Sequence, residues 1–265
     1  MYENRLGRTL SADERFVPSR FLQRLASVPE HAMREALWGE ALVECTPERA
    51  AELVMATLRA MSQRRRGGRE SYLSLVRLVE RRPQARLTLQ LAARHEEALK
   101  PLFSNGAPVR VAEADELPPP PLKSDRDITL GERRSWARRP DRDLLARLVL
   151  DPDPMVIRNL LHNPRLIEQD VLRIVSRRPI GEDVLAEVFH HHSWGQRPAV
   201  QLALVLNPYT PVLMAAGLVA LLDVGQVRDL VDDPGVHEVV RERAKAALEW
   251  RGEAGTAVPA ELEEG

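Results

Sequence analysis

An arginine-rich run between residues 59 and 94 has the strongest chemical character in the sequence. It contains ten Arg against two Glu, so ten minus two leaves a local charge of +8. The planar guanidinium fork matches the oxygen atoms of phosphate and carboxylate groups. One interpretation is therefore a surface that binds a nucleic-acid backbone, and its contact residues would be Arg64, Arg65, Arg66 and Arg69.

Two other features of the sequence weaken that interpretation. The formal net charge of the whole chain is −1, which gives no overall attraction to nucleic acid. Tyr72 is the one aromatic residue within the run, whereas proteins that bind single strands stack bases on several aromatic side chains. We favour the alternative, a solvated helix face whose arginines pair with carboxylates of neighbouring helices or of the acidic C-terminal tail.

A polar group before Pro164 is the second candidate site. Arg158 and His162 are four residues apart, so they share one face of a helix, and Asn159 lies beside them. If successive helices stack, these three side chains form part of a wall that binds a protein or peptide partner. The alternative is that such polar residues have a structural role, and it is clearest for Asn163 and Asn207, which occupy equivalent positions directly before Pro. There a side-chain amide can bond backbone groups left free where a helix ends.

Three consecutive histidines, His190 to His192, precede Ser193 and Trp194. Metal ligands on a helix lie about one turn apart, whereas adjacent residues point in different directions. The sequence contains no HExxH element and no other Cys or His pair at ligand spacing. We therefore predict no metal site and no cofactor, and interpret the histidines as the polar end of a helix before the loop at Gly195.

Motifs that anchor common enzyme classes are also missing. There is no GxxxxGK[ST] loop, no GxGxxG fingerprint and no GxSxG elbow. Paired carboxylates such as Asp151 and Asp153 stand beside Pro, where they are typical helix caps rather than an acid and base pair. The sequence predicts no catalytic residues and a protein that is not an enzyme.

The elements that must position these residues are short helices separated by Pro. Pro lacks a donor N–H and is hostile to a helix interior, although it is tolerated in the first turn. Between the stops, apolar residues recur at spacings of three and four, which indicates helices rather than strands. The stops are Pro140, Pro152, Pro164, Pro179, Pro208 and Pro234. The predicted caps are Asp141, Asp153, Thr210, and Thr129 with Glu132 as a capping box.

The segments VIRNLLHNPRLIEQDVLRIVSRRP and QLALVLNPYTPVLMAAGLVALLD then resemble a known family. They are similar to the leucine-rich repeat variant, a bacterial relative of HEAT-like repeats, whose units read Asn-Pro, a capping Thr with Pro, and a Leu-rich helix. The best match is Asn207, Pro208, Thr210 and Pro211, and the resemblance covers about residues 129–250. Some members carry a cysteine-ligated iron–sulfur cluster. This chain has one cysteine, Cys45, so a four-thiolate cluster is excluded.

The resemblance implies a HEAT-like right-handed helical solenoid in the C-terminal half. Apolar spacing in residues 18–103 predicts an N-terminal helical domain of five helices, with starts at Pro18, Glu30, Pro47, Glu70 and Gln84. The expected fold is therefore all-α. The segment from 104 to 127 is rich in Pro, including Pro118–Pro121, and we interpret it as a linker rather than as a docking site for a Pro-binding module. The expected parts are an N-terminal arm (1–17), a helical domain (18–103), the linker (104–127), the repeat domain (128–251) and a disordered acidic tail (252–265).

An extended repeat surface suits a non-catalytic scaffold or adaptor that binds a protein or peptide. The arginine-rich run supports the alternative of nucleic-acid binding, and a HEAT-like enzyme acting on a bound partner is a second alternative. The sequence has no signal-peptide run and no stretch of 18 apolar residues. We therefore expect no membrane partner and a cytoplasmic location.

Overall fold

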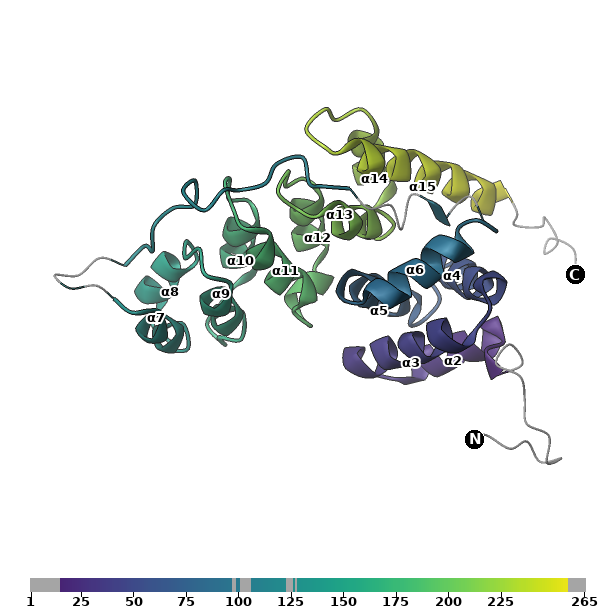
Figure 1. The fold of residues 1–265 in the computed structure, drawn as a ribbon, viewed down its shortest axis with the longest axis horizontal. Coiled ribbons are helices and arrows are strands. Elements are labelled where there is room, and N and C mark those ends of the chain that lie inside the picture. Colours follow the sequence, from purple (N-terminus) through teal and green to yellow (C-terminus); the bar gives the residue numbers. More distant parts are fainter. Residues whose placement is uncertain (1–14, 97–98, 101–105, 123–125, 127, 257–265) are drawn as a thin grey trace, which may run out of the picture. The chain divides into compact units, whose positions relative to one another are not determined.

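The computed structural model describes residues 15–96, 99–100, 106–122, 126 and 128–256 (Figure 1). Within these residues the regular elements are fourteen α-helices and one 3-10 helix, and none is a strand. The all-α prediction is confirmed. Over the same residues no helix combines the length and the apolar character needed to cross a membrane. Most of the expected N-terminal arm and acidic tail lies outside the described residues.

The chain divides into two compact units. Unit 1 contains residues 1–104, 223–231 and 241–265, and unit 2 contains residues 105–222 and 232–240. This grouping differs from the expected ranges, which place residues 223–231 and 241–251 in the repeat domain. These residues belong to unit 1 because they pack against the N-terminal half: Arg243, for example, is 3% exposed and hydrogen-bonds the buried Tyr72.

Unit 1 is built around helix α5. The helix buries ten of its fourteen residues and packs against four other helices, α2, α3, α4 and α6. The five helix starts expected from the sequence in this half are each found within two residues of the predicted position. The helices are α2 (Pro18–Ser27), α3 (His31–Glu44), α4 (Pro47–Ser62), α5 (Gly68–Arg81), α6 (Pro83–Ala92), α14 (Val224–Val231) and α15 (Glu238–Thr256), whose first three residues belong to unit 2.

Aromatic side chains join α2, α3 and α5 in the core of unit 1. Phe21 contacts Phe16 and Trp38 edge to face, with ring centroids 5.7 and 4.9 Å apart. Edge-to-face contacts of this kind add to the stabilisation from burial alone. The Trp38 Nε1–H donates a 3.0 Å hydrogen bond to the Ser71 carbonyl, so this fully buried indole also has its polar atom satisfied.

Unit 2 is a stack of helices that are each seven to nine residues long. Isolated helices of this length are unstable in water, so their stability must come from packing. Helix α9 packs against both α7 and α11, and α10 packs against α12, so these helices contact the next but one along the chain (Figure 1). The elements are α7 (Leu130–Trp136), α8 (Arg142–Leu148), α9 (Pro154–Leu161), α10 (Glu168–Val175), α11 (Glu182–His190), η2 (Trp194–Gln196), α12 (Pro198–Val205) and α13 (Val212–Val219).

Most of the predicted caps of unit 2 are confirmed. Asp141 and Asp153 each accept two backbone N–H groups, and Thr129 with Glu132 forms the complete capping box. The prediction for Thr210 is wrong. Its buried hydroxyl donates to the Leu204 carbonyl at 2.6 Å, and Pro211 occupies the cap position of α13. The hydroxyl expected to cap the next helix is thus bonded to a carbonyl at the end of the preceding one, which also accepts the Asn207 N–H at 3.3 Å.

The residue before four of the Pro stops closes a local turn. In each case its Oδ1 accepts the backbone N–H two residues later, at 2.8–3.0 Å. The side chain therefore replaces a backbone acceptor where Pro has interrupted the helix. The four residues are Asp151, Asn163, Asn207 and Asp233.

Two of these residues also bridge to an earlier helix. The Asn163 amide donates to the carbonyls of Ala137 and Arg139 at 2.8 and 2.9 Å. The Asn207 amide donates to those of Val175 and Arg177 at 2.6 and 3.1 Å. Each amide satisfies two carbonyls that a helix end leaves without an intrahelical partner. The structural role expected for the two asparagines is therefore observed, and it extends to neighbouring helices.

The Arg177 guanidinium makes a third bridge of this kind, and the carbonyls that it contacts lie between those of the Asn163 and Asn207 bridges along the chain. Its Nη1 donates to the carbonyls of Val149 and Asp151 at 3.0 and 3.1 Å. The ends of α7, α8 and α10 are thus each tied to a side chain 24 to 32 residues later. The helices are therefore joined by polar contacts as well as by apolar packing.

An ion pair between α8 and α10 gives the stack a dependence on acid. Arg142 donates to both Asp170 oxygens, at 2.6 and 3.2 Å, and the Ile167 N–H donates to Oδ2 at 3.2 Å. Burial disfavours the charged carboxylate, but these hydrogen bonds and the guanidinium charges of Arg142 and Arg173 outweigh it. The pKa of Asp170 therefore lies below its ordinary value of 3.8.

We predict that Asp170→Asn lowers the free energy of unfolding by about 1.5 kcal/mol at pH 7, because hydrogen bonds to a charged group are lost. A lowered pKa stabilises the fold above the unfolded-state value and loses that effect as the pH falls through the folded-state value. The difference between variant and wild type should therefore shrink below about pH 4. Urea denaturation at pH 7 and pH 3 measures it, and an equal difference at both pH values would refute this account.

Candidate functional site

The ends of α9 and α11 bring three histidines together. His162 directly follows α9 and His191 directly follows α11. The rings of His162 and His191 are 4.8 Å apart edge to face, and His191 stacks on His192 at 4.6 Å. We call these three residues the histidine cluster. The sequence suggested two separate features here, and the fold combines them.

The hydrogen bonds of the cluster fix how its rings present their nitrogen atoms. His162 Nδ1 lies 2.8 Å from the Arg158 carbonyl, which can only accept, so Nδ1 carries the proton. The neutral ring then keeps Nε2 as its acceptor. His191 Nδ1 accepts the backbone N–H groups of Ser193 and Trp194, both at 3.3 Å. Because His191 is 8% exposed while His162 is exposed, His191 supports the turn and His162 faces solvent.

An arginine–glutamate pair crosses from α9 to α11 beside the cluster. Arg158 Nε donates to Glu187 Oε2 at 2.8 Å, and Nη2 lies 2.5 Å from Oε1. The hydrogen bond and the charge of Glu187 raise the pKa of Arg158 above its ordinary value. The side chain of Arg158 is 51% exposed, so the pair holds the guanidinium in place at the surface.

Asn159 is held in the same way by residues of α7 and of the turn after it. Its Oδ1 accepts from Arg138 Nη2 at 3.0 Å, and its amide donates to the Arg134 carbonyl at 3.3 Å. The three partner-binding residues predicted from the sequence, Arg158, Asn159 and His162, therefore lie together beside the end of α9. Sequence reasoning missed Glu187, Arg138 and the contact with His191 and His192.

One signal in the sequence could have found part of this site. Arg158 and Glu187 are 29 residues apart, and so are His162 and His191. Equal offsets are expected when two helices stack in register, since residues at the same place in successive units then meet. We call this site the α9–α11 surface. It consists of the exposed residues Arg158, His162 and His192 and the half-buried residues Asn159 and Glu187.

Trp194 closes the α9–α11 surface at one end. Its Nε1–H donates to the Leu161 carbonyl at 2.9 Å, so the indole covers the last turn of α9. The Arg197 guanidinium lies 5.6 Å from the Trp194 ring, within the range of a cation–π contact. Arg197 also lies 3.4 Å from Glu168. Trp194 therefore packs against the main chain of α9 within unit 2.

The histidine cluster does not have the geometry of a metal site. Over the residues with described positions, no group of three or more His, Cys, Asp or Glu side chains is arranged to hold a metal ion. The physical reason is visible in the cluster, because both His162 and His191 use Nδ1 for backbone contacts. The rings contact one another through faces and edges instead of pointing at a common centre.

The arginine-rich run does not form a single face in unit 1. Arg64, Arg65 and Arg66 are exposed in the turn between α4 and α5. Arg69, in contrast, is half-buried, and burial lowers its pKa. Arg77 is 1% exposed, and burial lowers its pKa to about 10.

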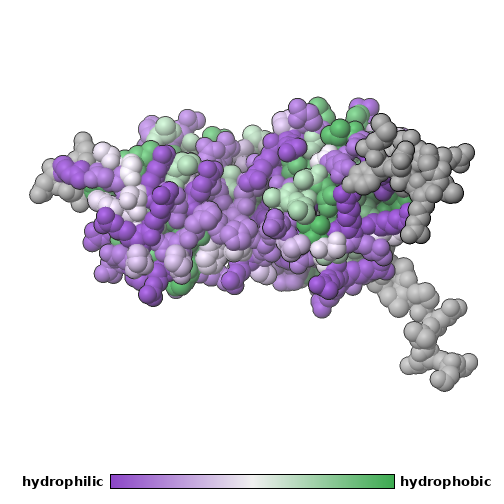
Figure 2. Space-filling view, turned by 90° about the horizontal axis from the view of Figure 1, so that it is seen from below, coloured by the Kyte–Doolittle hydropathy of each residue, from purple (hydrophilic) through white to green (hydrophobic). Residues whose placement is uncertain are grey.

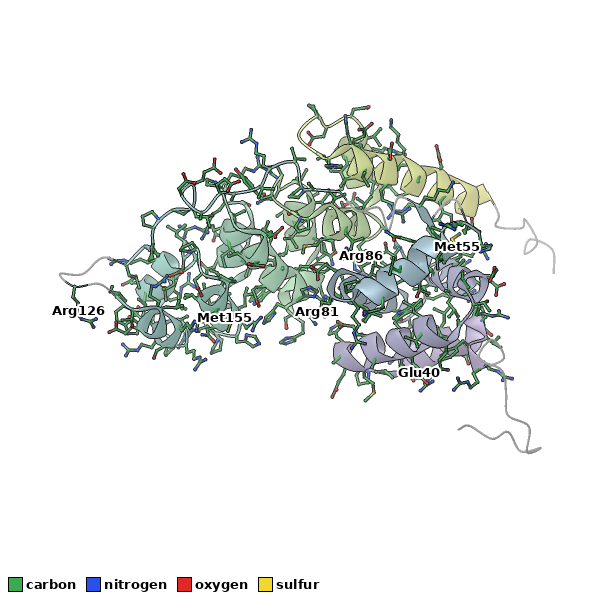
Figure 3. All side chains as sticks on the ribbon, in the orientation of Figure 1. Glu40, Met55, Arg81, Arg86, Arg126 and Met155 are labelled. Atoms are coloured by element: carbon green, nitrogen blue, oxygen red, sulfur yellow. The ribbon has the colours of Figure 1, made fainter. Side chains whose placement is uncertain are left out.

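The arginines at the end of the run contact their own unit. Arg81 lies 3.6 Å from Glu35 of α3, and Arg86 donates to the Glu80 carbonyl at 3.1 Å (both arginines are labelled in Figure 3). The run is divided because α5 is surrounded by other helices, so its side chains must point in several directions. Of the four residues predicted to contact nucleic acid, Arg64, Arg65 and Arg66 are exposed together and Arg69 is not.

On the face shown in Figure 2, hydrophilic side chains predominate and hydrophobic ones are scattered among them. Scattered apolar residues are normal on a protein surface, so the α9–α11 surface is distinguished by its polar contacts.

Comparison with known proteins found no relative of this chain. No protein-family model, no curated protein and no solved structure matches it.

Proposed function

We propose that the protein is a non-catalytic helical-repeat scaffold or adaptor that binds a protein or peptide partner through the α9–α11 surface. In this proposal unit 2 is a HEAT-like right-handed solenoid. The observation that carries the proposal is the pair of equal 29-residue offsets, Arg158 to Glu187 and His162 to His191. They join the exposed Arg158 and His162 at the end of α9 to Glu187 and His191 at the end of α11.

The side chains of this surface are preorganised. Arg158 is oriented by Glu187, Asn159 by Arg138, and His162 by a backbone carbonyl. Side chains that are ordered before binding lose less conformational entropy when a partner arrives. They offer a guanidinium and a carboxylate beside an imidazole acceptor, which suits the mixed donors and acceptors of a polypeptide.

The repeats supply the rigidity that such a surface needs. Side chains of later units bond the carbonyls at the ends of α7, α8 and α10. A stack of units held by both apolar and polar contacts presents an extended surface with a fixed spacing of residues. This supports recognition of a partner by position along the stack, as in other repeat scaffolds.

The test is an affinity pull-down from the lysate of the native cell, with and without nuclease, analysed by mass spectrometry. It compares the wild type with Arg158→Ala/His162→Ala. Arg147→Ala/Gln169→Ala, which changes two exposed residues of α8 and α10, is the matched control. We expect a stoichiometric protein partner whose recovery is unchanged by nuclease treatment and by the control variant. Its recovery should fall at least about tenfold with the surface variant. Equal recovery with both variants would exclude this surface.

Nucleic-acid binding is the second candidate, and the exposed turn at Arg64, Arg65 and Arg66 favours it. Three adjacent guanidinium groups can contact successive phosphates, and the affinity would then fall steeply with salt. The nuclease arm of the same experiment separates the two candidates. Partners that disappear with nuclease, together with nucleic acid in the eluate, would favour this turn over the α9–α11 surface.

A further inference from the structure

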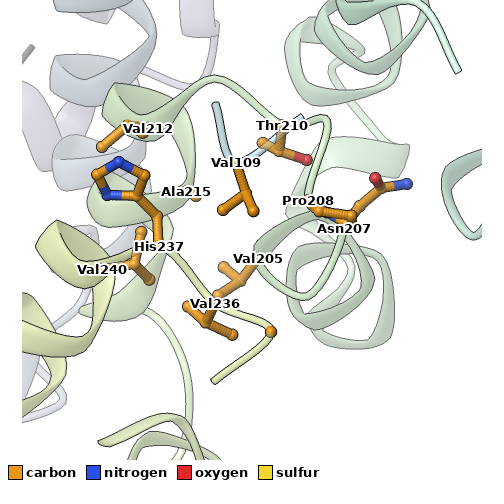
Figure 4. Close-up of a pocket in the computed structure, with 11 residues that line it drawn as sticks. Val109, Val205, Asn207, Pro208, Thr210, Val212, Ala215, Val236, His237 and Val240 are labelled. Carbon is orange, nitrogen blue, oxygen red and sulfur yellow. The ribbon is translucent and has the colours of Figure 1, made fainter. Parts of the chain in front are cut away.

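A small apolar pocket lies in unit 2 between the end of α12, helix α13 and the residues that lead into α15 (Figure 4). Its walls are mainly aliphatic, from Val205, Val212, Val236 and Val240. With Val109 among its lining residues, the pocket leaves about 10 Å³ of free space, room for no more than about one water molecule. An aliphatic side chain of a ligand can therefore enter it only by replacing Val109.

The polar groups around the pocket already have roles in the fold. Thr210 donates to the Leu204 carbonyl, and the Asn207 amide donates to two carbonyls of α10 and the turn after it. His237 Nδ1 accepts the Val239 N–H at 3.1 Å. Pro208 has no N–H, but its carbonyl accepts a hydrogen bond from the N–H of Arg110, which is distant from it in the sequence. The pocket thus combines aliphatic walls with one backbone acceptor at its edge.

Residues 106–111, which we call the strap, cross this pocket. Val109 is one of the lining residues and lies among the others in Figure 4. The next N–H, that of Arg110, donates to the Pro208 carbonyl at 3.0 Å. Gly106 lies against Val212 and His237, where a Cβ atom would approach both to 3.4 Å. The strap therefore occupies the pocket as an extended segment with one aliphatic side chain and one backbone donor.

The strap is held by few contacts. Val109 remains 47% exposed and Val111 61% exposed, so about half of Val109 and more than half of Val111 stay in contact with water. Among the residues that the structure describes, one backbone hydrogen bond outside the helices joins the strap to the rest of unit 2. A segment with little burial and little hydrogen bonding opens at low free-energy cost. A better ligand can therefore displace it.

We propose that the pocket is a docking site for an extended peptide segment of a partner protein, and that the strap is its intramolecular competitor. The occupant in place defines the ligand: a β-branched aliphatic residue in the pocket, preceded by Pro and followed by a basic residue. Pro favours the extended geometry of its neighbours. The basic residue suits the carboxylates of Asp232, Asp233 and Glu238, which flank the pocket lining in the sequence. This site is separate from the α9–α11 surface and does not depend on it.

The test uses the full chain and a fluorescein-labelled synthetic peptide with the sequence of residues 107–112, APVRVA, in a fluorescence anisotropy titration. Val109→Asp places a carboxylate against aliphatic walls and should release the strap while leaving the helices intact. We expect this variant to bind the peptide at least about tenfold more tightly than the wild type, because the competitor is gone. Ala215→Leu, which fills the pocket, and a peptide with Asp in place of the first Val should both abolish binding.

Equal affinity of the peptide for the wild type and Val109→Asp, or no binding to either, would overturn the proposal. A second measurement does not depend on the variant: hydrogen exchange at the Arg110 amide of the wild type should accelerate when excess peptide displaces the strap. Unchanged exchange at saturating peptide would also count against it. The Arg158→Ala/His162→Ala variant should bind the peptide like the wild type, so failure of this site and failure of the proposed function can be told apart.

Discussion

Replacing Asp151 by Ala should lower the free energy of unfolding by about 3–5 kcal/mol, which is typical for breaking one half of a buried ion pair. The Asp151 side chain is fully buried, and Arg133 Nη1 lies 2.5 Å from both of its oxygens. Removing the carboxylate leaves a buried guanidinium without its opposite charge. The turn at Pro152 is weakened as well, because Asp151 Oδ1 accepts the Asp153 N–H at 3.0 Å.

A double variant separates the charge from the turn. Arg133→Met with Asp151→Asn removes both charges and keeps a side-chain oxygen for the turn, as Asn163 and Asn207 do at equivalent stops. Replacing a buried ion pair by groups of similar volume is often neutral, so the double variant should recover most of the stability that Asp151→Ala loses. Urea denaturation followed by circular dichroism measures both. A loss below about 1 kcal/mol for Asp151→Ala would show that the pair contributes little.

Replacing Gly67 by Ala should lower the free energy of unfolding by about 3 kcal/mol, through backbone strain and a steric clash. Gly67 has φ of 77° and precedes α5. A left-handed backbone costs an L-residue roughly 1–2 kcal/mol. A Cβ atom at Gly67 would also lie 2.7 Å from both Cα and Cβ of Ala26 in α2, so α2 or α5 must shift.

Gly252→Ala is the matched control for this prediction. Gly252 lies in α15, where an added Cβ atom would meet nothing within 4 Å. The control should therefore be neutral or gain up to about 1 kcal/mol from helix propensity. Thermal denaturation of the two variants beside the wild type measures the difference. If Gly67→Ala were as stable as the control, the close approach of α2 to the start of α5 would not constrain the fold.

The backbone at Gly67 also bears on the second candidate function, nucleic-acid binding. The exposed turn at Arg64, Arg65 and Arg66 directly precedes it, and Arg64 itself has a positive φ of 52°. Gly68 is constrained too, because a Cβ atom there would lie 2.9 Å from the backbone of Ala60 and Met61. The conformation that presents the three arginines therefore depends on two adjacent glycines.

The sequence by itself determined the local structure of this protein. Pro stops, caps and apolar spacing act within one or two helical turns, so they predicted the all-α class, five helix starts in unit 1 and the caps at Asp141, Asp153 and Thr129. The same local logic anticipated that Asn163 and Asn207 would serve backbone groups at helix ends. It failed at Thr210, because two helix ends compete there for one hydroxyl.

The tertiary structure decided which residues meet. The ion pairs Arg158–Glu187 and Arg133–Asp151 and the contact between His162 and His191 join residues that are 18 to 29 positions apart. The tertiary structure also decided that α14 and most of α15 group with the N-terminal helices. Helical periodicity fixes which face of a helix a side chain occupies, but it does not say which other helix covers that face. That choice depends on the packing of many apolar side chains at once, and the α9–α11 surface and the strap pocket both arise from it.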